Sequence, residues 1–364
     1  MKKPVLIALI VATLAVGGFA GWWFTAGTSG IPTARVSKGP VAPRPDHFTI
    51  VWAGDTMLGW NADKMLRKKG YEHVLGKISP LLEADYTVLN LEAPATELTR
   101  EDMPEKHRKW TYQVAPKTVK AFSELGIDAW SLANNHLYDR GRKGVFDTFA
   151  YSEEAGVAYF GAGMNRTKAE APLLIPTPHG TVGVVGLSHR GPRLEQARAD
   201  RPGLVYIGNR EIVKGYEVAK KAGADIVIGF PHWGINYEAL RPQEMRQAEL
   251  FAKTGYDLVV GHGPHVQQPV GMQGDMPVLY SLGNFVFSTQ GRFQKLGDKD
   301  PYGLVAKTFI GPEGIERIEL RCILIDNLVV KYRPRPCTEK ERADSFSKLG
   351  PGVMVEGDAA VVLF

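Results

Sequence analysis

Short apolar runs that end in glycine or polar residues alternate with stretches of helical spacing over most of this chain. The stretches of helical spacing lie at 117–125, 145–155, 210–222 and 242–254. The apolar runs, which predict strands, lie at 48–53, 86–91, 126–133, 156–160, 181–187, 225–230, 257–260 and 277–281. Strands and helices that alternate in this way are typical of an α/β fold with a largely central sheet.

The pattern changes towards the C-terminus, where the helical spacing stops after about residue 303. Residues 304–310, 315–324 and 328–332 are predicted strands joined by short turns. We expect them to be antiparallel strands, added at an edge of the sheet or forming a second sheet.

The N-terminus carries a candidate membrane segment. Residues 4–24 have no charged side chain and, at ~1.5 Å per helical residue, are long enough to cross the ~30 Å hydrocarbon layer. Lys2 and Lys3 precede this segment and the next charge is Arg35, an asymmetry that places the N-terminus in the cytoplasm. We therefore expect a single anchor in the cell membrane, with the rest of the chain on the extracytoplasmic side. A cleaved signal peptide is the alternative, because a short charged start, an apolar centre and small residues also fit that description.

The segment that follows is rich in proline and glycine and has no apolar periodicity. Such a composition is typical of a flexible linker. The sequence therefore predicts three parts: an anchor or signal segment at 1–24, a linker at 25–47 and one α/β domain at 48–364.

Charge and cysteine content narrow the choice of function class. The chain has 364 residues and a formal net charge of +5, and two of those positive charges precede the apolar segment. The remaining excess is too small to indicate nucleic-acid binding. Cys322 and Cys337 fit one disulfide in an oxidising compartment and fit two buried thiols equally well.

Polar residues of the kinds that bind metals or transfer protons follow six of the apolar runs. They are Asp55, Glu92, Asn134, Asn135, His136, Asp139, His232, His262, His265 and Asn284. Each has an ordinary explanation by itself, as a helix cap, a turn residue or a packed histidine. At one edge of a sheet, however, they would form a mixed set of nitrogen and oxygen donors. Such a set suits Mn, Fe or Zn, whereas Mg and Ca favour oxygen ligands.

Two ions side by side need a bridging carboxylate, and only Asp55 and Glu92 follow apolar runs at suitable positions. Other catalytic classes lack their central residues. The chain has no phosphate-binding Walker loop, no G-x-S-x-G motif and no cysteine in these motifs. Metal-assisted chemistry is therefore the interpretation that we favour.

In order along the chain, the motifs GDTMLG, NLEAP, LANNHLYDRG, HWGINYE, GHGPHVQQP and YSLGNF resemble those of the CapA family of poly-gamma-glutamate capsule synthesis proteins. The resemblance runs from about residue 48 to about residue 287. It extends to the calcineurin-like metallophosphoesterases. It implies a four-layer α/β/β/α sandwich, two sheets faced by helices, with the motifs gathered at one edge.

The resemblance also implies a role for each residue. The implied ligands of one or two divalent ions (Mn, Fe or Zn) are Asp55, Glu92 as the bridging carboxylate, Asn135, His232, His262 and His265. His136 is the implied general acid and Asp139 its orienting partner. Asn134, Trp233 and Asn284 are predicted to contact the substrate.

Two positions depart from the metallophosphoesterase pattern. Met57 stands where those enzymes have the histidine of an Asp-x-His motif. His262 and His265 are separated by two residues, where those enzymes have one. We therefore expect the first ion to be short of a ligand, and the number of ions stays open.

The function implied by the resemblance is the synthesis or processing of poly-gamma-glutamate capsule, or of another envelope polymer, by metal-dependent hydrolysis. The expected partners are an anionic glutamate polymer and membrane proteins of synthesis or export, and no nucleic acid. A non-catalytic component of a synthesis or export complex is one alternative. A general envelope phosphoesterase is another.

Overall fold

The computed structural model describes residues 42–99, 102, 111–189, 193–297 and 299–364. The predicted anchor and most of the predicted linker at 25–47 lie outside these ranges. Across the ranges that are described, no helix is long and apolar enough to cross a membrane. The anchor and the limits of the three parts therefore stay predictions.

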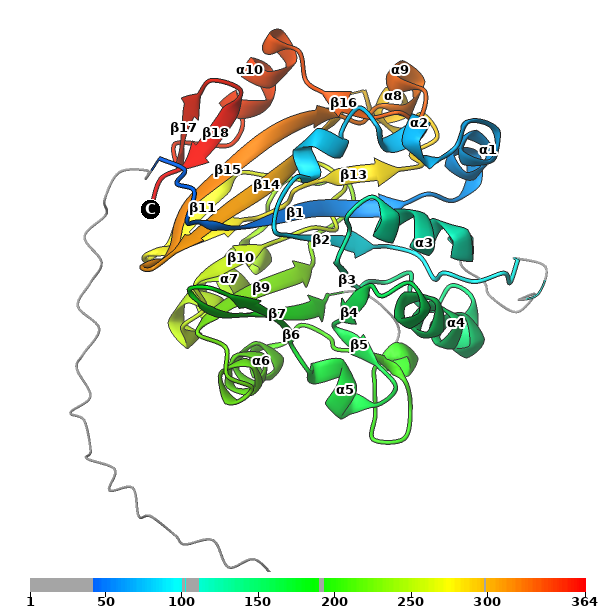
Figure 1. Cartoon of the computed structure of the whole chain (residues 1–364), viewed down its shortest axis with the longest axis horizontal. Helices are drawn as coiled ribbons and strands as arrows, with labels where there is room; N and C mark the ends of the chain where they lie inside the picture. The colour runs from blue at the N-terminus through cyan, green and yellow to red at the C-terminus, as the bar shows by residue number, and fades with distance from the viewer. Residues whose placement is uncertain (1–41, 100–101, 103–110, 190–192, 298) are drawn as a thin grey trace, which may run out of the picture. The chain divides into compact units, whose positions relative to one another are not determined.

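The larger of two main sheets has ten strands and is built around β1 (Phe48–Met57) (Figure 1). Three parallel strands follow on one side of β1 in the order β2 (Tyr86–Leu91), β3 (Ala129–Ser131) and β4 (Ala158–Phe160). Every residue of β1 from Ile50 onward is buried. A central strand covered on both faces is expected to be apolar throughout.

The C-terminal strands extend this sheet on the other side of β1. β14 (Tyr302–Gly311) pairs antiparallel with the first part of β1, and β13 (Asn284–Phe287) pairs in parallel with its end. β15 (Gly314–Leu324) pairs antiparallel with β14, which confirms two of the predicted C-terminal strands. The remaining strands are β16 (Arg335–Pro336), β17 (Val353–Glu356) and β18 (Ala359–Val362).

The second main sheet has six strands, of which the central four are parallel. Its order is β11 (Val270–Gln273), β12 (Met276–Leu279), β10 (Leu258–Val260), β9 (Ile226–His232), β7 (Gly180–Ser188) and β6 (Leu173–Thr177). Two short strands, β5 (Ala162–Gly163) and β8 (Gly203–Leu204), form a separate pair.

Helices cover the outer faces of both sheets (Figure 1). Those on the larger sheet are α1 (Trp60–Lys69), α2 (Tyr71–Leu75), α3 (Pro116–Glu124) and α4 (Gly141–Glu154). Those on the second sheet are α5 (Arg166–Glu170), α6 (Asn209–Lys221) and α7 (Pro242–Thr254). The limits of α7 follow from its sequence, since proline stands at its first position and Gly255 after its end has a left-handed backbone (φ 110°).

An apolar layer between the inner faces of the two sheets holds them together. Phe230 of β9 contacts Trp52 of β1 at 5.9 Å and Phe160 of β4 at 5.7 Å between ring centroids. Each sheet also packs against its own helices through a further apolar cluster. The predicted four-layer α/β/β/α sandwich is therefore confirmed.

The prediction that helices stop near residue 303 is wrong. α8 (Arg292–Leu296) lies before that point and agrees with the prediction. However, α9 (Asn327–Val330) occupies the segment predicted as a strand at 328–332. The side chain of Asp326 accepts a hydrogen bond from the backbone N–H of Leu328 (2.9 Å) and thereby begins α9. A further helix, α10 (Glu339–Ser347), begins with a capping box. In both places a local cap decides the structure, and the apolar pattern does not.

The first described residues are attached to β15. The guanidinium of Arg44 and the ring Nε2 of His47 lie 2.9 and 3.1 Å from the carboxylate of Glu316. The end of the predicted linker is therefore fixed to the larger sheet.

Cys322 of β15 and Cys337 form a disulfide, with their Cα atoms 5.4 Å apart. The sequence left this pairing open. The bond ties the segment that contains α9 to the larger sheet, and it fits an oxidising compartment.

Replacing both cysteines by serine is expected to lower the free energy of unfolding by about 3 kcal/mol, because the bond closes a loop with a sequence separation of 15 residues. Urea unfolding of the full-length chain measures this change. The reduced wild-type chain is the control, since it keeps both sulfur atoms without the bond. An unfolding midpoint that is the same for the oxidised, reduced and serine forms would contradict the prediction.

Candidate functional site

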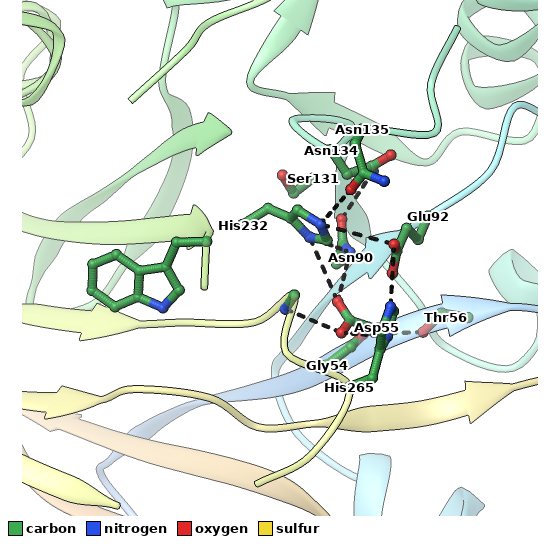
Figure 2. Close-up of polar contacts among 12 residues, drawn as sticks. Gly54, Asp55, Thr56, Asn90, Glu92, Ser131, Asn134, Asn135, His232 and His265 are labelled. Atoms are coloured by element: carbon green, nitrogen blue, oxygen red, sulfur yellow. Dashed lines mark hydrogen bonds and ion pairs between the residues drawn. The ribbon is translucent and has the colours of Figure 1, made fainter. Parts of the chain in front are cut away.

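The carboxyl ends of strands from both sheets meet at one edge. Figure 2 shows six of the predicted polar residues there: Asp55, Glu92, Asn134, Asn135, His232 and His265. β1 contains Asp55 near its end, and β2 ends just before Glu92. β9 ends at His232, and β10 ends just before His262. A parallel bridge between His232 and His262 holds the two histidine segments side by side.

Asp55 lies at an irregular position of β1. The register of β1 shifts next to Asp55 against both β13 and β2. An irregularity of this kind re-aims the side chain. The preceding residue must be glycine, because a Cβ on Gly54 would lie 2.0 Å from the carbonyl oxygen of Gly283.

The carboxylate of Asp55 is completely buried and contacts three groups. It accepts hydrogen bonds from the Asn90 amide (2.9 Å) and the Gly263 backbone N–H (3.0 Å), and it lies 3.1 Å from Nδ1 of His265. Burial alone would raise the pKa of Asp55. The hydrogen bond with His265 and the charges of His265 and His232 outweigh burial and hold that pKa well below its usual range. Asp55 is therefore the ionised carboxylate that a cation needs as a ligand.

Glu92 lies at the centre of three imidazole rings. Its Oε1 atom is 3.7 Å from Nε2 of His136 and 3.8 Å from Nε2 of both His232 and His265. These separations exceed a hydrogen bond, which spans ~2.7–3.2 Å. The separations from His232 and His265 fit two ligands of one ion with metal–ligand distances of ~2.0–2.2 Å. Glu92 itself is 1% exposed.

His262 is completely buried, and neither of its ring nitrogens has a hydrogen-bond partner within the described residues. Burial lowers the pKa of His262 to about 4, although the nearby charge of Asp55 acts in the opposite direction. The ring is therefore neutral near pH 7, which is the form that binds a metal. Leaving buried polar atoms without partners costs free energy, and a bound ion would offset that cost.

His265 is held in place by its backbone and by Asn284. Its backbone is left-handed (φ 64°), which is uncommon for a residue other than glycine. Its Nδ1 lies 3.0 Å from the side-chain oxygen of Asn284. The other ring nitrogen, Nε2, consequently faces Glu92.

Two overlapping groups bring their donor atoms within 4.8 Å of one another. One contains Asp55, His232 and His262, and the other contains Asp55, Glu92 and His265. Asp55 belongs to both groups, whereas the resemblance implies Glu92 as the bridging carboxylate. These carboxylate and imidazole donors fit Mn, Fe or Zn.

Two other predicted positions border these groups. The side-chain oxygen of Asn135 lies 2.8 Å from Nε2 of His232, beside the predicted ligands. Met57 is buried, and its sulfur accepts a hydrogen bond from the backbone N–H of Gly59 (3.1 Å). The thioether thus fills the position of the histidine in the metallophosphoesterase motif that the sequence resembles.

Asn90, which the sequence analysis did not single out, connects the groups. Its amide nitrogen donates to Asp55 and lies 3.3 Å from Nδ1 of His232, and its oxygen accepts from the amide of Asn134 (3.0 Å). Asn90 lies within the apolar run of β2, two residues before Glu92. A polar residue inside such a run is the feature of the sequence that could have identified it as a site residue. Its parallel pairing with Asp55 in the sheet could not be deduced from the run itself.

His136 and Asp139 form a buried pair. Nδ1 of His136 lies 2.6 Å from Oδ2 of Asp139, which also accepts the backbone N–H of Tyr112 (2.7 Å). Because Nδ1–H donates a hydrogen bond to Asp139, Nε2 is the atom directed towards Glu92. This geometry suits an imidazole that is oriented to give a proton from Nε2.

The three residues predicted to contact the substrate are completely buried. Asn134 bonds to Asn90 and to the carbonyl of Leu91, Trp233 donates to the carbonyl of Tyr280 (2.8 Å), and Asn284 orients His265. Each therefore supports the site from within the protein, and direct contact with a substrate stays a prediction.

Comparison with other proteins gives matches across the part of the chain that carries these residues. Residues 49–289 match the family described as bacterial capsule synthesis protein PGA_cap. The chain is 30% identical over 293 residues to the capsule biosynthesis protein CapA of Bacillus anthracis, covering 79% of this chain and 69% of that protein. It is 27% identical over 289 residues to the PGA biosynthesis protein CapA of Bacillus subtilis, covering 79% of this chain and 73% of that protein.

Among solved structures, the sulfate thiohydrolase SoxB of Thermus thermophilus is similar with a TM-score of 0.47 and 13% sequence identity. The superposition covers 86% of this chain and 63% of that chain.

Proposed function

Because this chain belongs to the bacterial capsule synthesis protein family PGA_cap, we propose that it processes poly-gamma-glutamate or a related envelope polymer by metal-dependent hydrolysis. The observation that carries the proposal is the buried cluster of two carboxylates and three histidines at the sheet edge, with His136 beside it. Within this cluster, both ring nitrogens of His262 are without a partner in the described part of the chain. A purely structural histidine would have a hydrogen-bond partner at such a depth.

The residues of the cluster divide into ligands and a proton donor. Asp55, Glu92, His232, His262 and His265 would hold one or two ions of Mn, Fe or Zn, with Asn135 beside them. A bound ion supplies a Lewis acid that polarises the scissile group and lowers the pKa of water.

His136 provides the proton that the departing atom needs. Asp139 fixes the imidazole by its contact with Nδ1 and stabilises the protonated ring. Nε2 then gives its proton to the departing nitrogen of an amide or to the departing oxygen of an ester. In a gamma-linked glutamate polymer the departing atom is the amide nitrogen.

We further propose that the protein is held at the membrane by residues 4–24, with the catalytic domain on the extracytoplasmic side. The disulfide between Cys322 and Cys337 supports an oxidising compartment. At that surface the domain would meet the anionic polymer and the membrane proteins that make or export it.

A non-catalytic role in a synthesis or export complex is the second candidate. The observation that favours it is the depth of the cluster, because Asp55, His232 and His262 are 0% exposed. In that case the ion would stabilise the fold, and His136 would have no substrate to protonate.

Elemental analysis of the purified full-length chain tests the proposal. We expect one or two equivalents of Mn, Fe or Zn per chain, and metal-dependent release of fragments from gamma-linked polyglutamate. Treatment with a chelator should abolish the release, and re-addition of the ion should restore it. A chain that binds none of these ions in stoichiometric amount would contradict the metal site. A metal-loaded chain that leaves the polymer intact would favour the non-catalytic candidate.

A further inference from the structure

Two tyrosines cover the histidines of the site from the outside. The ring of Tyr112 lies 4.0 Å from that of His136, and the ring of Tyr237 lies 5.5 Å from that of His265, between centroids. Tyr112 is 8% exposed and Tyr237 is 7% exposed. The two side chains therefore lie between the buried cluster and the surface.

The hydroxyl groups of both tyrosines are available for a ligand. Neither has a hydrogen-bond partner in the ranges that the structure describes. Neither hydroxyl oxygen is among the fully buried atoms that lack a partner, so both reach the surface while their rings stay buried. A polar group of a bound molecule can therefore contact them.

Arg292, at the start of α8, adds a positive charge to the same region. Its guanidinium carbon lies 5.5 Å from the centre of the Tyr237 ring. The side chain is exposed, and its guanidinium forms no ion pair or hydrogen bond with any residue that the structure describes. By contrast, Arg67 and Arg335 are each paired with a carboxylate.

The charges of this region act on both hydroxyls. Burial raises the pKa of Tyr112 and of Tyr237, the charge of Glu92 adds to this effect, and the charge of Arg292 opposes it. Arg292 and Glu92 therefore act on the two hydroxyls with opposite sign. An acidic group at these hydroxyls would be attracted by the guanidinium and repelled by the carboxylate of Glu92.

Backbone strain is concentrated in the same region. Among the described residues, six other than glycine have positive φ, and four of these are Trp60, Tyr237, His265 and Gln290. Trp60 packs on Tyr112 at 4.7 Å, and Gln290 lies two residues before Arg292. Strained conformations persist where the surrounding structure enforces them, and they cluster at binding sites.

We propose that Arg292 and the hydroxyls of Tyr112 and Tyr237 form a subsite that binds a carboxylate of the substrate next to the bond that is cleaved. The planar guanidinium matches a carboxylate with two parallel hydrogen bonds, and the hydroxyls donate to its remaining lone pairs. The subsite selects an anionic polymer over a neutral one. Arg292 lies outside the range 49–289 that matches the family, so the family match does not assign this role. The inference rests on the proposed function for the identity of the polymer.

Equilibrium binding of two probes to the metal-loaded, full-length chain tests the subsite. One probe is a short oligomer of gamma-linked glutamate, and the other is the same oligomer with its carboxylates converted to amides. For Arg292→Ala we expect binding of the acidic oligomer to weaken about 10- to 100-fold, because one charged hydrogen-bond pair is lost. Binding of the neutral oligomer should not change. Arg292→Lys should recover part of the affinity, since it keeps the charge and loses the planar fork.

Arg246→Ala is the matched control, because Arg246 is an exposed arginine of α7 on the outer face of the second sheet. It should bind both probes as the wild type does. Thermal unfolding and metal content of all variants show whether the fold and the ions are retained. Equal binding of the acidic oligomer by wild type and Arg292→Ala would overturn the subsite. Wild-type binding that does not distinguish the acidic from the neutral oligomer would also overturn it.

Turnover measured on the same samples separates this inference from the proposed function. Binding that depends on Arg292, without cleavage by the wild type, would contradict hydrolysis and support the subsite. Cleavage with the same KM in the wild type and in Arg292→Ala would support hydrolysis and overturn the subsite.

Discussion

Replacing His136 by glutamine is expected to lower the turnover of gamma-linked polyglutamate by about 10²- to 10⁴-fold, the usual contribution of a general acid. The metal content should stay at the wild-type value. His136 belongs to neither of the two groups of converging donor atoms, and its Nδ1 is engaged by Asp139. Glutamine keeps a polar side chain at the position and cannot give up a proton near neutral pH. Steady-state kinetics and elemental analysis of the same preparation provide the two measurements.

His179→Gln serves as the control for this variant. His179 lies just before the first residue of β7. Ser188, which pairs with His232, is at the other end of this strand. We expect His179→Gln to turn over the polymer at the wild-type rate. A folded, metal-loaded His136→Gln chain with wild-type turnover would remove His136 from the mechanism. If the wild type does not cleave the polymer and His136→Gln supports capsule formation fully, the non-catalytic role is the better account.

Replacing Asp55 by asparagine is expected to weaken metal binding by at least about 100-fold. Loss of a group that only supports a ligand costs ~10- to 100-fold, and Asp55 is itself a candidate ligand in both groups of converging donors. The substitution also removes the negative charge that lies 3.1 Å from Nδ1 of His265. Titration of the metal-free, full-length chain with Mn, Fe and Zn measures the change in affinity. Turnover should fall with the metal content.

Asp275→Asn is the matched control for the loss of charge. Asp275 is exposed in the turn between β11 and β12, away from the carboxyl ends of the parallel strands. Its metal affinity should equal that of the wild type. Because Asp55 is buried, its replacement also tests stability, and circular dichroism shows whether Asp55→Asn is folded. A folded Asp55→Asn chain that binds two ions with wild-type affinity would show that the cluster does not use Asp55.

The sequence predicted most of the strands and longer helices that surround the site. Central strands such as β1 and β9 are covered on both faces, so their apolar runs are continuous and easily recognised. The prediction from the sequence failed at α9, where the side-chain cap from Asp326 begins a helix within an apolar segment. Local hydrogen bonds of this kind do not change the hydrophobic pattern and were therefore missed.

The hydrophobic pattern could not predict chemistry that depends on contacts between residues distant in the sequence. Asn90 looked like one more residue of a strand, and only its pairing beside Asp55 shows that it joins the two groups of candidate ligands. Tyr112 and Arg292 belong to no motif, and only the tertiary structure places Tyr112 against His136 and Arg292 against Tyr237. The pairing of Cys322 with Cys337 was likewise open until the distance between their Cα atoms was known.

By itself, the sequence determined the order of the motifs, the residue types that follow each strand and hence the mixed carboxylate and imidazole chemistry. Only the tertiary structure decided which atoms meet. Asp55 and Glu92 come from one sheet and the three histidines from the other, so they converge only when the two sheets stack face to face. The direction of each side chain then follows from local backbone geometry, such as the irregular register at Asp55 and the left-handed backbone of His265. A one-dimensional pattern carries no information on these directions, because they are fixed by packing between segments that are far apart in the chain.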